Sequence, residues 1–326
     1  MSLLKTTARH AIPAAWIALY ATTLPAQAQN YPARTVRIIV PTAPGGGSDT
    51  QARLLGKRYT ESMGQPFVID NRPGASGMIG AELVARAPAD GYTLLFASAL
   101  LATHALLFKK ISFDPLKDLA AVSQISFAPQ YLMVHPSVPA RNVPEFIALA
   151  KKNPGKLNAG SSGNGSANHL AIEMLKQAAA VSITHIPYRS GAPSITALMG
   201  GEIDCAFSGA VTALPHLRSG RVRALAVTSI KRTAAAPEVP TLDSIYPGFD
   251  SANWYAMLVP AATPAAIVNR LHAETMSALK APEIRDFITG EGAELVGSAP
   301  AELAAYLRRE IERYARVIKA ANIKAE

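Results

Sequence analysis

Short apolar runs alternate with helix-like stretches through most of this chain, and this alternation restricts the fold more than any other feature. The runs have the length of buried strands, and the stretches between them carry apolar residues at helical spacing. Strands are predicted at residues 36–40, 67–69, 93–96, 131–134, 183–186, 203–207 and 222–227. Helices are predicted at residues 49–62, 77–87, 144–152, 166–179, 191–199 and 211–218. Strands that alternate with helices predict parallel α/β sheets.

Two segments are expected to cross between lobes. Residues 122–134 form a β-rich run, and residues 249–260 lead into a second apolar strand. After Pro264 the pattern becomes helical, and this tail is long enough to pack back on the first lobe. We therefore predict two α/β lobes joined by two crossing segments. The first lobe takes residues 29–128 plus 254–326, and the second takes residues 129–253.

The first 28 residues have the pattern of a secretory signal peptide. Basic Lys5 and Arg9 precede an apolar stretch, and Ala26-Gln27-Ala28 offers a small-residue cleavage site. We place the cut after Ala28, so that the mature chain begins at residue 29. With a single cysteine, the exported protein has no internal disulfide and depends on its apolar core, which fits a bacterial periplasm.

The charge pattern argues against nucleic-acid binding. The chain carries a formal net charge of +9, but its basic residues are scattered and are not interleaved with aromatic residues. Such a balance gives a mild long-range attraction for anions. We expect a monomer with a small anionic ligand.

The turn Pro44-Gly45-Gly46-Gly47-Ser48-Asp49 is the sharpest candidate binding feature. It joins a predicted strand to a predicted helix, so the first N–H groups of that helix lack intrahelical acceptors. A second turn, Arg72-Pro73-Gly74-Ala75-Ser76-Gly77, precedes the next helix in the same way. Such helix starts hold a carboxylate or a phosphate without any Lys or Arg. The first turn has neither the dinucleotide-binding nor the Walker pattern, and its alternative is an ordinary strand-to-helix connection. For the second turn the alternative is a plain turn.

A third segment, residues 159–169, adds hydroxyl groups to another helix start. It contains Ser161, Ser162 and Ser166 among five glycine and asparagine positions that favour turns, with a flexible loop as the alternative. Its place in the second lobe would let it face the first two turns across a cleft.

Catalytic and metal-binding patterns are not recognisable in the sequence. No G-x-S-x-G elbow occurs, and the histidines have no H-E-x-x-H spacing. Cys205 lies in an apolar strand pattern typical of an inert buried thiol. We therefore expect no catalytic residue, no metal and no cofactor.

Several motifs in one order resemble the periplasmic substrate-binding proteins of tripartite tricarboxylate transporters, often called Bug receptors. The likeness extends over nearly the whole mature chain. The motifs are Val40-Pro41 leading into the first glycine turn, Asn71-Arg72-Pro73-Gly74-Ala75, Asp90-Gly91-Tyr92-Thr93, Ile186-Pro187-Tyr188, Leu225-Ala226-Val227-Thr228, Val239-Pro240-Thr241-Leu242, and Trp254 before Pro260-Ala261-Ala262-Thr263-Pro264.

The resemblance implies a two-lobed, type II-like periplasmic binding protein fold that closes on a small organic carboxylate. It also implies hand-over of that ligand to the large and small membrane subunits of a transporter. By position, the first lobe would contribute Gly46, Gly47, Ser48, Asp49, Ser76 and Gly77 to the carboxylate site. The second lobe would contribute Ser161, Ser162, Ser166, Tyr188 and Asp204.

The sequence leaves the ligand and the physiological role open. Ser76 and Met78 depart from the usual family pattern, and so does Arg189 after the tyrosine. Arg189 either favours a second acidic group on the ligand or points outward. The alternatives to a transport receptor are a sensor that presents its ligand to a signalling partner and an exported enzyme acting on a small acid.

Overall fold

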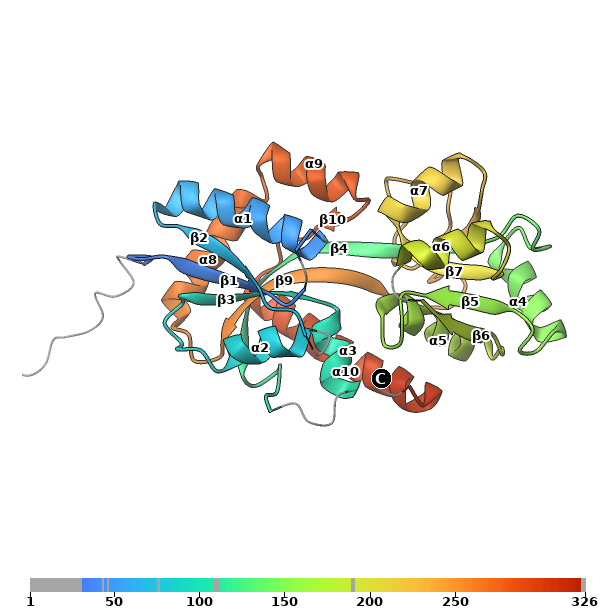
Figure 1. Cartoon of the computed structure of the whole chain (residues 1–326), viewed down its shortest axis with the longest axis horizontal. Helices are drawn as coiled ribbons and strands as arrows, with labels where there is room; N and C mark the ends of the chain where they lie inside the picture. The colour runs from blue at the N-terminus through green and yellow to red at the C-terminus, as the bar shows by residue number, and fades with distance from the viewer. Residues whose placement is uncertain are drawn as a thin grey trace, which may run out of the picture. The chain divides into compact units, whose positions relative to one another are not determined.

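Helices and strands alternate along the chain as the sequence predicts (Figure 1). The computed structural model describes residues 31–42, 44–45, 47–74, 77–107, 112–188 and 191–323. The predicted signal peptide and its cleavage site therefore lie outside the described residues. The strands are β1 (Val36–Val40), β2 (Phe67–Asn71), β3 (Thr93–Ser98), β4 (Leu119–Val134), β5 (Asn158–Ser161), β6 (Thr184–Pro187), β7 (Cys205–Gly209), β8 (Arg223–Val227), β9 (Ala252–Pro260) and β10 (Glu294–Leu295). The helices are α1 (Gly47–Met63), α2 (Met78–Ala85), α3 (Leu100–Leu107), α4 (Val143–Lys152), α5 (Ala167–Ala179), α6 (Gly191–Met199), α7 (Ala210–Arg218), α8 (Ala265–Ala278), α9 (Pro282–Gly290) and α10 (Pro300–Ala321).

The long strand β4 belongs to two sets of strands. Its first part pairs antiparallel with β9, and β9 pairs antiparallel with β3. Beyond β3 lie β1 and β2, and β3, β1 and β2 run parallel to one another. Its last part pairs antiparallel with β7 and β8, and β7, β5 and β6 run parallel. Helices flank both sets. The described chain thus forms two α/β lobes with β4 and the entry to β9 between them.

Pro129 stands where β4 changes partner. Pro129 pairs with Ala252 at the end of the β9 ladder, and the next residue, Gln130, pairs with Gly209 of β7. Because proline has no N–H to donate, it interrupts a hydrogen-bonded ladder at low cost only at such a junction. Pro129 thus lies where β4 passes from the β9 ladder to the β7 ladder.

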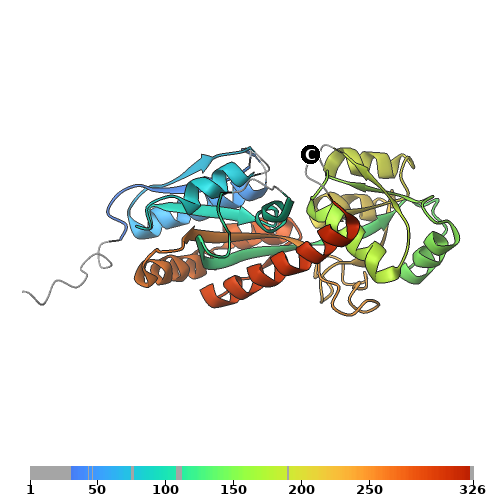
Figure 2. The same cartoon turned by 90° about the horizontal axis from the view of Figure 1, so that it is seen from below.

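Helix α10 contacts both lobes from one side of the sheet. It packs against α3 and β4, and it also contacts α5 of the second lobe. Figure 2 shows this helix in red beneath the strands. Gln177 of α5 donates a hydrogen bond to the carbonyl oxygen of Val317 at 3.4 Å. The tail predicted to pack on the first lobe thus reaches the second lobe as well.

An ionic group lies between α10 and the chain that enters β9, with Glu310 buried and Asp250 and Arg313 half-buried. Arg313 hydrogen-bonds Glu310, and its Nη1 lies 3.6 Å from Oδ2 of Asp250. Burial raises the pKa of both carboxyls against the opposing effect of Arg313. One arginine therefore compensates two carboxylates at the point where the lobes join.

Candidate functional site

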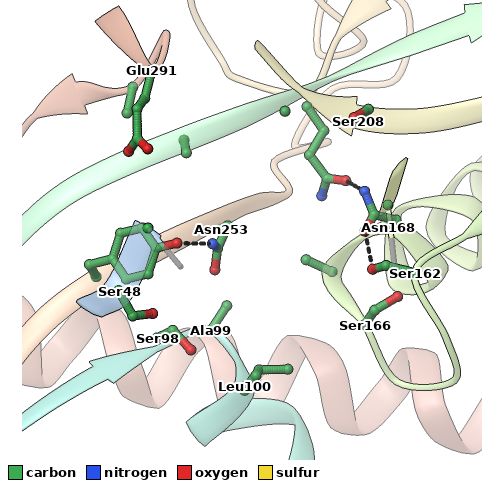
Figure 3. A pocket seen from close by; sticks show the side chains of 18 of the residues that line it. Ser48, Ser98, Ala99, Leu100, Ser162, Ser166, Asn168, Ser208, Asn253 and Glu291 are labelled. Atoms are coloured by element: carbon green, nitrogen blue, oxygen red, sulfur yellow. Dashed lines mark hydrogen bonds between the residues drawn. The ribbon is translucent and has the colours of Figure 1, made fainter. Parts of the chain in front are cut away.

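A cavity of about 480 Å³ lies where the loops after β1, β3, β5 and β7 meet (Figure 3). These loops leave the carboxyl ends of parallel strands, the usual place for ligands in open α/β sheets. The volume suits a small molecule. The cavity is lined by Thr42, Gly47, Ser48, Gln51, Ser98, Ala99, Leu100, Thr103, Ala128, Gln130, Ser162, Ser166, Ala167, Asn168, Gly191, Ser208, Gly209, Ala210, Thr212, Asn253, Tyr255, Glu291 and Ala293.

In the described structure, five helices begin at the wall of this cavity. Their first residues are Gly47 of α1, Leu100 of α3, Ala167 of α5, Gly191 of α6 and Ala210 of α7. The first N–H groups of each helix have no intrahelical acceptor, and the helix dipole places partial positive charge there. The convergence of several such starts makes the cavity attractive to an anion.

Formal charge contributes little to that attraction. Among the described lining residues, Glu291 is the only charged one, and no Lys, Arg or His faces the cavity. Within the same part of the chain, no group of three or more His, Cys, Asp or Glu side chains is placed to hold a metal ion. Neutral N–H and O–H groups therefore dominate the lining. Two of the lining hydroxyls already donate inside the protein, that of Ser162 to Oδ1 of Asn168 and that of Ser166 to the Gly163 carbonyl oxygen.

A chain of hydrogen bonds fixes the orientation of Gln130. The carbonyl oxygen of Phe207 only accepts, so it defines the Nδ2 end of Asn168, which donates to it at 2.8 Å. The same Nδ2 donates to Oε1 of Gln130 at 2.7 Å, and the hydroxyl of Ser162 donates to Oδ1 of Asn168 at 2.6 Å. Nε2 of Gln130 is left as the free end.

This free amide is a strong sign of a ligand. Gln130 is 2% exposed, and its Nε2 has no hydrogen-bond partner in the described structure. A buried N–H₂ group without an acceptor costs free energy, of the order of 1–3 kcal/mol. An acceptor on a bound ligand would remove that cost.

Tyr255 and Glu291 form another part of the wall. Asn253 donates to the hydroxyl oxygen of Tyr255 at 3.0 Å, and Ser48 also hydrogen-bonds this hydroxyl. Burial, with the nearby Glu291 carboxylate, raises the pKa of Tyr255. The Tyr255 hydroxyl is therefore neutral and held in place beside the start of α1.

Four of the residues predicted from the sequence line the cavity: Gly47, Ser48, Ser162 and Ser166. Gly46 and Ser76 lie outside the described residues, as does Arg189. Asp49, Gly77, Ser161, Tyr188 and Asp204 are described but do not line it.

Asp49 organises the first turn with its side chain. Its carboxylate accepts hydrogen bonds from Gly45 N at 2.9 Å, Arg53 Nε at 2.9 Å and Asn71 Nδ2 at 3.0 Å. Although burial disfavours the charged form, these donors outweigh it and lower the pKa of Asp49. The carboxylate is thus consumed in holding the turn, α1 and β2 together.

Gly77, Asp204 and Tyr188 make contacts that hold the fold together. Gly77 packs at φ +92° against Pro41, and a Cβ there would lie 3.1 Å from the Pro41 carbonyl oxygen. Asp204 stands just before β7, at the end of the strand opposite Gly209, and its Oδ2 accepts from Asn158 N at 2.7 Å. Tyr188 N donates to the Ser161 carbonyl oxygen at 3.0 Å.

Ser161 and His185 are the pair most like a nucleophile and base, with Oγ 2.6 Å from Nε2. Ser161 is 1% exposed, and its Oγ also accepts from Gly163 N at 3.1 Å. His185 stacks on His169 with ring centroids 3.7 Å apart. Burial and that neighbour lower the pKa of His185 to about 4. The pair thus supports the 162–166 loop through hydrogen bonds, and neither residue lines the cavity.

Sequence reasoning missed several lining residues. Ser98, Ala99 and Leu100 form a strand-to-helix connection without glycine, so no turn signal marked it, although a strand was predicted just before it. Gln130 and Asn168 come together only through the tertiary fold. Glu291 directly follows α9, and no sequence motif around it indicates a binding site.

Comparisons with known proteins identify the family. A family model described as the tripartite tricarboxylate transporter family receptor matches residues 51–323. Protein BugT of Bordetella pertussis is 34% identical over 303 residues, which cover 92% of this chain and 93% of BugT.

Solved structures extend the similarity to the fold. A protein of R. palustris with adipate is 35% identical with a TM-score of 0.76, covering 90% of this chain and 99% of that one. MatC from Rhodopseudomonas palustris, with bound malate, is 32% identical with a TM-score of 0.73, covering 88% of this chain and 100% of that one. The predicted two-lobed fold is confirmed, and so is the resemblance seen in the sequence motifs. The chain belongs to the family of tripartite tricarboxylate transporter receptors.

Proposed function

We propose that this protein is a periplasmic receptor that binds one small organic carboxylate in the cavity and delivers it to the large and small membrane subunits of a transporter. The observation that carries the proposal is the meeting of five helix starts around one cavity with no basic side chain among its described lining residues. Neutral donors bind a carboxylate without burying a charge pair, whose desolvation is costly.

The ligand would be held between the lobes and enclosed by hinge closure. The proposed first lobe is residues 29–128 plus 254–326, and the proposed second lobe is residues 129–253. The change of partner along β4 at Gln130 and the start of β9 at Ala252 support these boundaries. Gly47 and Ser48 would contact the ligand from one lobe, and Ser162 and Ser166 from the other.

Export to the periplasm is part of the proposal and rests on the N-terminal pattern and the family. In the described part of the chain, no helix combines the length and the apolarity needed to cross a bilayer. The protein would act as a monomer, with the signal peptide removed after Ala28. Family membership supports transport over the sensor and enzyme alternatives.

Isothermal titration of the mature protein, stripped of ligand by unfolding and refolding, tests the proposal. We expect at least one mono-, di- or tricarboxylate to bind with a Kd in the micromolar range, about −8 kcal/mol. NMR over hours should show the ligand unchanged. A folded protein that binds no carboxylate in a wide panel would refute the receptor role, and turnover would favour the enzyme.

The Gly47→Val variant tests whether the ligand binds in this cavity. A Cβ at Gly47 would lie 3.1 Å from the Tyr255 hydroxyl and 3.7 Å from the Glu291 carboxylate, so a valine would project into the cavity between them. We expect at least a tenfold loss of affinity with little change in Tm. Gly290→Val is the matched control, because Gly290 lies at the end of α9 with no atom within 4 Å of its added Cβ. Equal affinity in the two variants would place the ligand elsewhere.

A further inference from the structure

We propose that Glu291 makes the cavity select carboxylates that also carry a cationic N–H group, such as small amino acids, over dicarboxylates. This rests on the proposed function, because it assumes that the ligand occupies this cavity. The lining offers neutral donors for a carboxylate, but at Glu291 it offers only an anionic acceptor.

The backbone holds Glu291 in position at the end of α9. Its N–H donates to the Phe287 carbonyl oxygen at 3.0 Å, and the next N–H, that of Gly292, donates to Thr289 at 2.9 Å. Figure 3 shows the Glu291 carboxylate directed into the cavity, on the other side from Asn168. The Glu291 carboxylate is therefore accessible to a ligand in the cavity.

Only one donor in the described structure satisfies this carboxylate. Nε2 of Gln51 donates to Oε2 of Glu291 at 3.3 Å, and the Ser126 hydroxyl donates to Oε1 of Gln51 at 2.8 Å. The Ser126 hydrogen bond therefore turns the amide end of Gln51 toward Glu291. A carboxylate accepts about four hydrogen bonds, so most of its capacity stays open.

In the part of the chain that the structure describes, no cation compensates the charge of Glu291. Among the described residues, none of the Lys, Arg or His side chains forms an ion pair with it, and burial raises its pKa against the single hydrogen bond from Gln51. A ligand ammonium would pair with the carboxylate and stabilise its charged form. A second ligand carboxylate would instead meet a like charge in a partly desolvated space.

The donor side of the cavity completes the selection. Nε2 of Gln130 is a buried donor whose polarity is fixed through Asn168, and it matches a carboxylate oxygen. An ammonium placed there would leave that donor unpaired. The cavity therefore distinguishes the two ends of a zwitterion, which a uniformly donor-lined cavity would not.

Three pairs of ligands of equal chain length test the proposal by titration calorimetry: β-alanine with succinate, 4-aminobutyrate with glutarate, and 5-aminopentanoate with adipate. Within each pair an ammonium replaces one carboxylate. We expect the amino acid to bind at least tenfold more tightly in the pair that fits best. In Glu291→Gln, the amino acid should lose at least tenfold and the dicarboxylate should gain.

Glu294→Gln is the matched control, because Glu294 is an exposed glutamate three residues along that does not line the cavity. It should leave the affinities for all six compounds unchanged. The inference would be overturned if the wild-type protein bound the dicarboxylates more tightly than the amino acids and Glu291→Gln did not increase the dicarboxylate affinity. The receptor role would remain intact in that case. If the wide carboxylate panel also failed to bind, the receptor role would fall with it.

Discussion

Replacing Gly292 with alanine should weaken ligand binding by holding the two lobes apart. Gly292 lies at φ +67° just after α9, and a Cβ built there would lie 2.0 Å from the Cβ of Ala210, the first residue of α7 in the other lobe. Carbon atoms pack at about 3.5–4.0 Å. The added methyl group therefore requires one lobe surface to retreat by roughly 1.5–2 Å.

Two costs arise, and only one of them affects affinity. An alanine in the left-handed region costs roughly 1–2 kcal/mol whether the lobes are open or closed, so it lowers stability alone. The overlap with Ala210 exists only while the lobes touch, and overpacking of this kind costs about 1–3 kcal/mol. The proposed binding mode requires the lobes to close, so this second cost falls on the bound form, and Kd should rise roughly 5- to 150-fold.

Gly220→Ala separates the two costs. Gly220 has φ +69° and no atom within 4 Å of an added Cβ, so its alanine carries the backbone cost without the overlap. Both variants should lose similar Tm, and only Gly292→Ala should lose affinity in a calorimetric titration. Adding Ala210→Gly to Gly292→Ala should restore affinity, relative to Ala210→Gly alone. Equal Kd values for Gly292→Ala and Gly220→Ala would refute the reasoning.

Three further outcomes follow from named contacts. Asn168→Asp should lower affinity at least tenfold by calorimetry, because a carboxylate would face the two acceptors that Nδ2 now joins. Arg313→Leu should lower the free energy of unfolding in urea by about 3–5 kcal/mol, because Asp250 and Glu310 lose the cation that they share. The loss should be smaller at low pH, where protonation removes the uncompensated charge of the two carboxylates. Since the folded protein lowers the pKa of His185 from 6.5 to about 4, the unfolded chain takes up the proton first, and the urea midpoint should fall as the pH drops through that window. His185→Asn should show a smaller fall, and an identical pH dependence would contradict the assignment.

The sequence predicts the fold well because its signals are local. Strand and helix periodicity needs only neighbours along the chain, so each predicted element overlaps an observed one. Helix α3 was missed because its apolar residues show no amphipathic spacing and Ser98-Ala99 supplies no turn signal. Pro129 lies in the predicted crossing segment 122–134, and β4 changes partner there because proline has no N–H to donate to a ladder.

The site was predicted only in part, because a turn does not reveal which way it faces. The first glycine turn leads to Gly47 and Ser48, which line the cavity, whereas in the second turn Gly77 packs on Pro41. Ser161 has the right residue type at the right strand end, but its hydroxyl hydrogen-bonds His185 behind the loop. Side-chain direction depends on such tertiary partners, which no local pattern encodes.

Binding by neutral donors and selection by charge are complementary properties of this cavity. Helix starts and amides attract any carboxylate, so on their own they give affinity with little discrimination. Discrimination requires a group that penalises the wrong ligand, and a single carboxylate among neutral donors does this with one residue. Because Glu291 hydrogen-bonds only Gln51 among the described residues, its charge is available for that purpose. A basic residue at the same position would instead favour a second ligand carboxylate, so changes at this one site would be enough to alter ligand class while the helix starts remain.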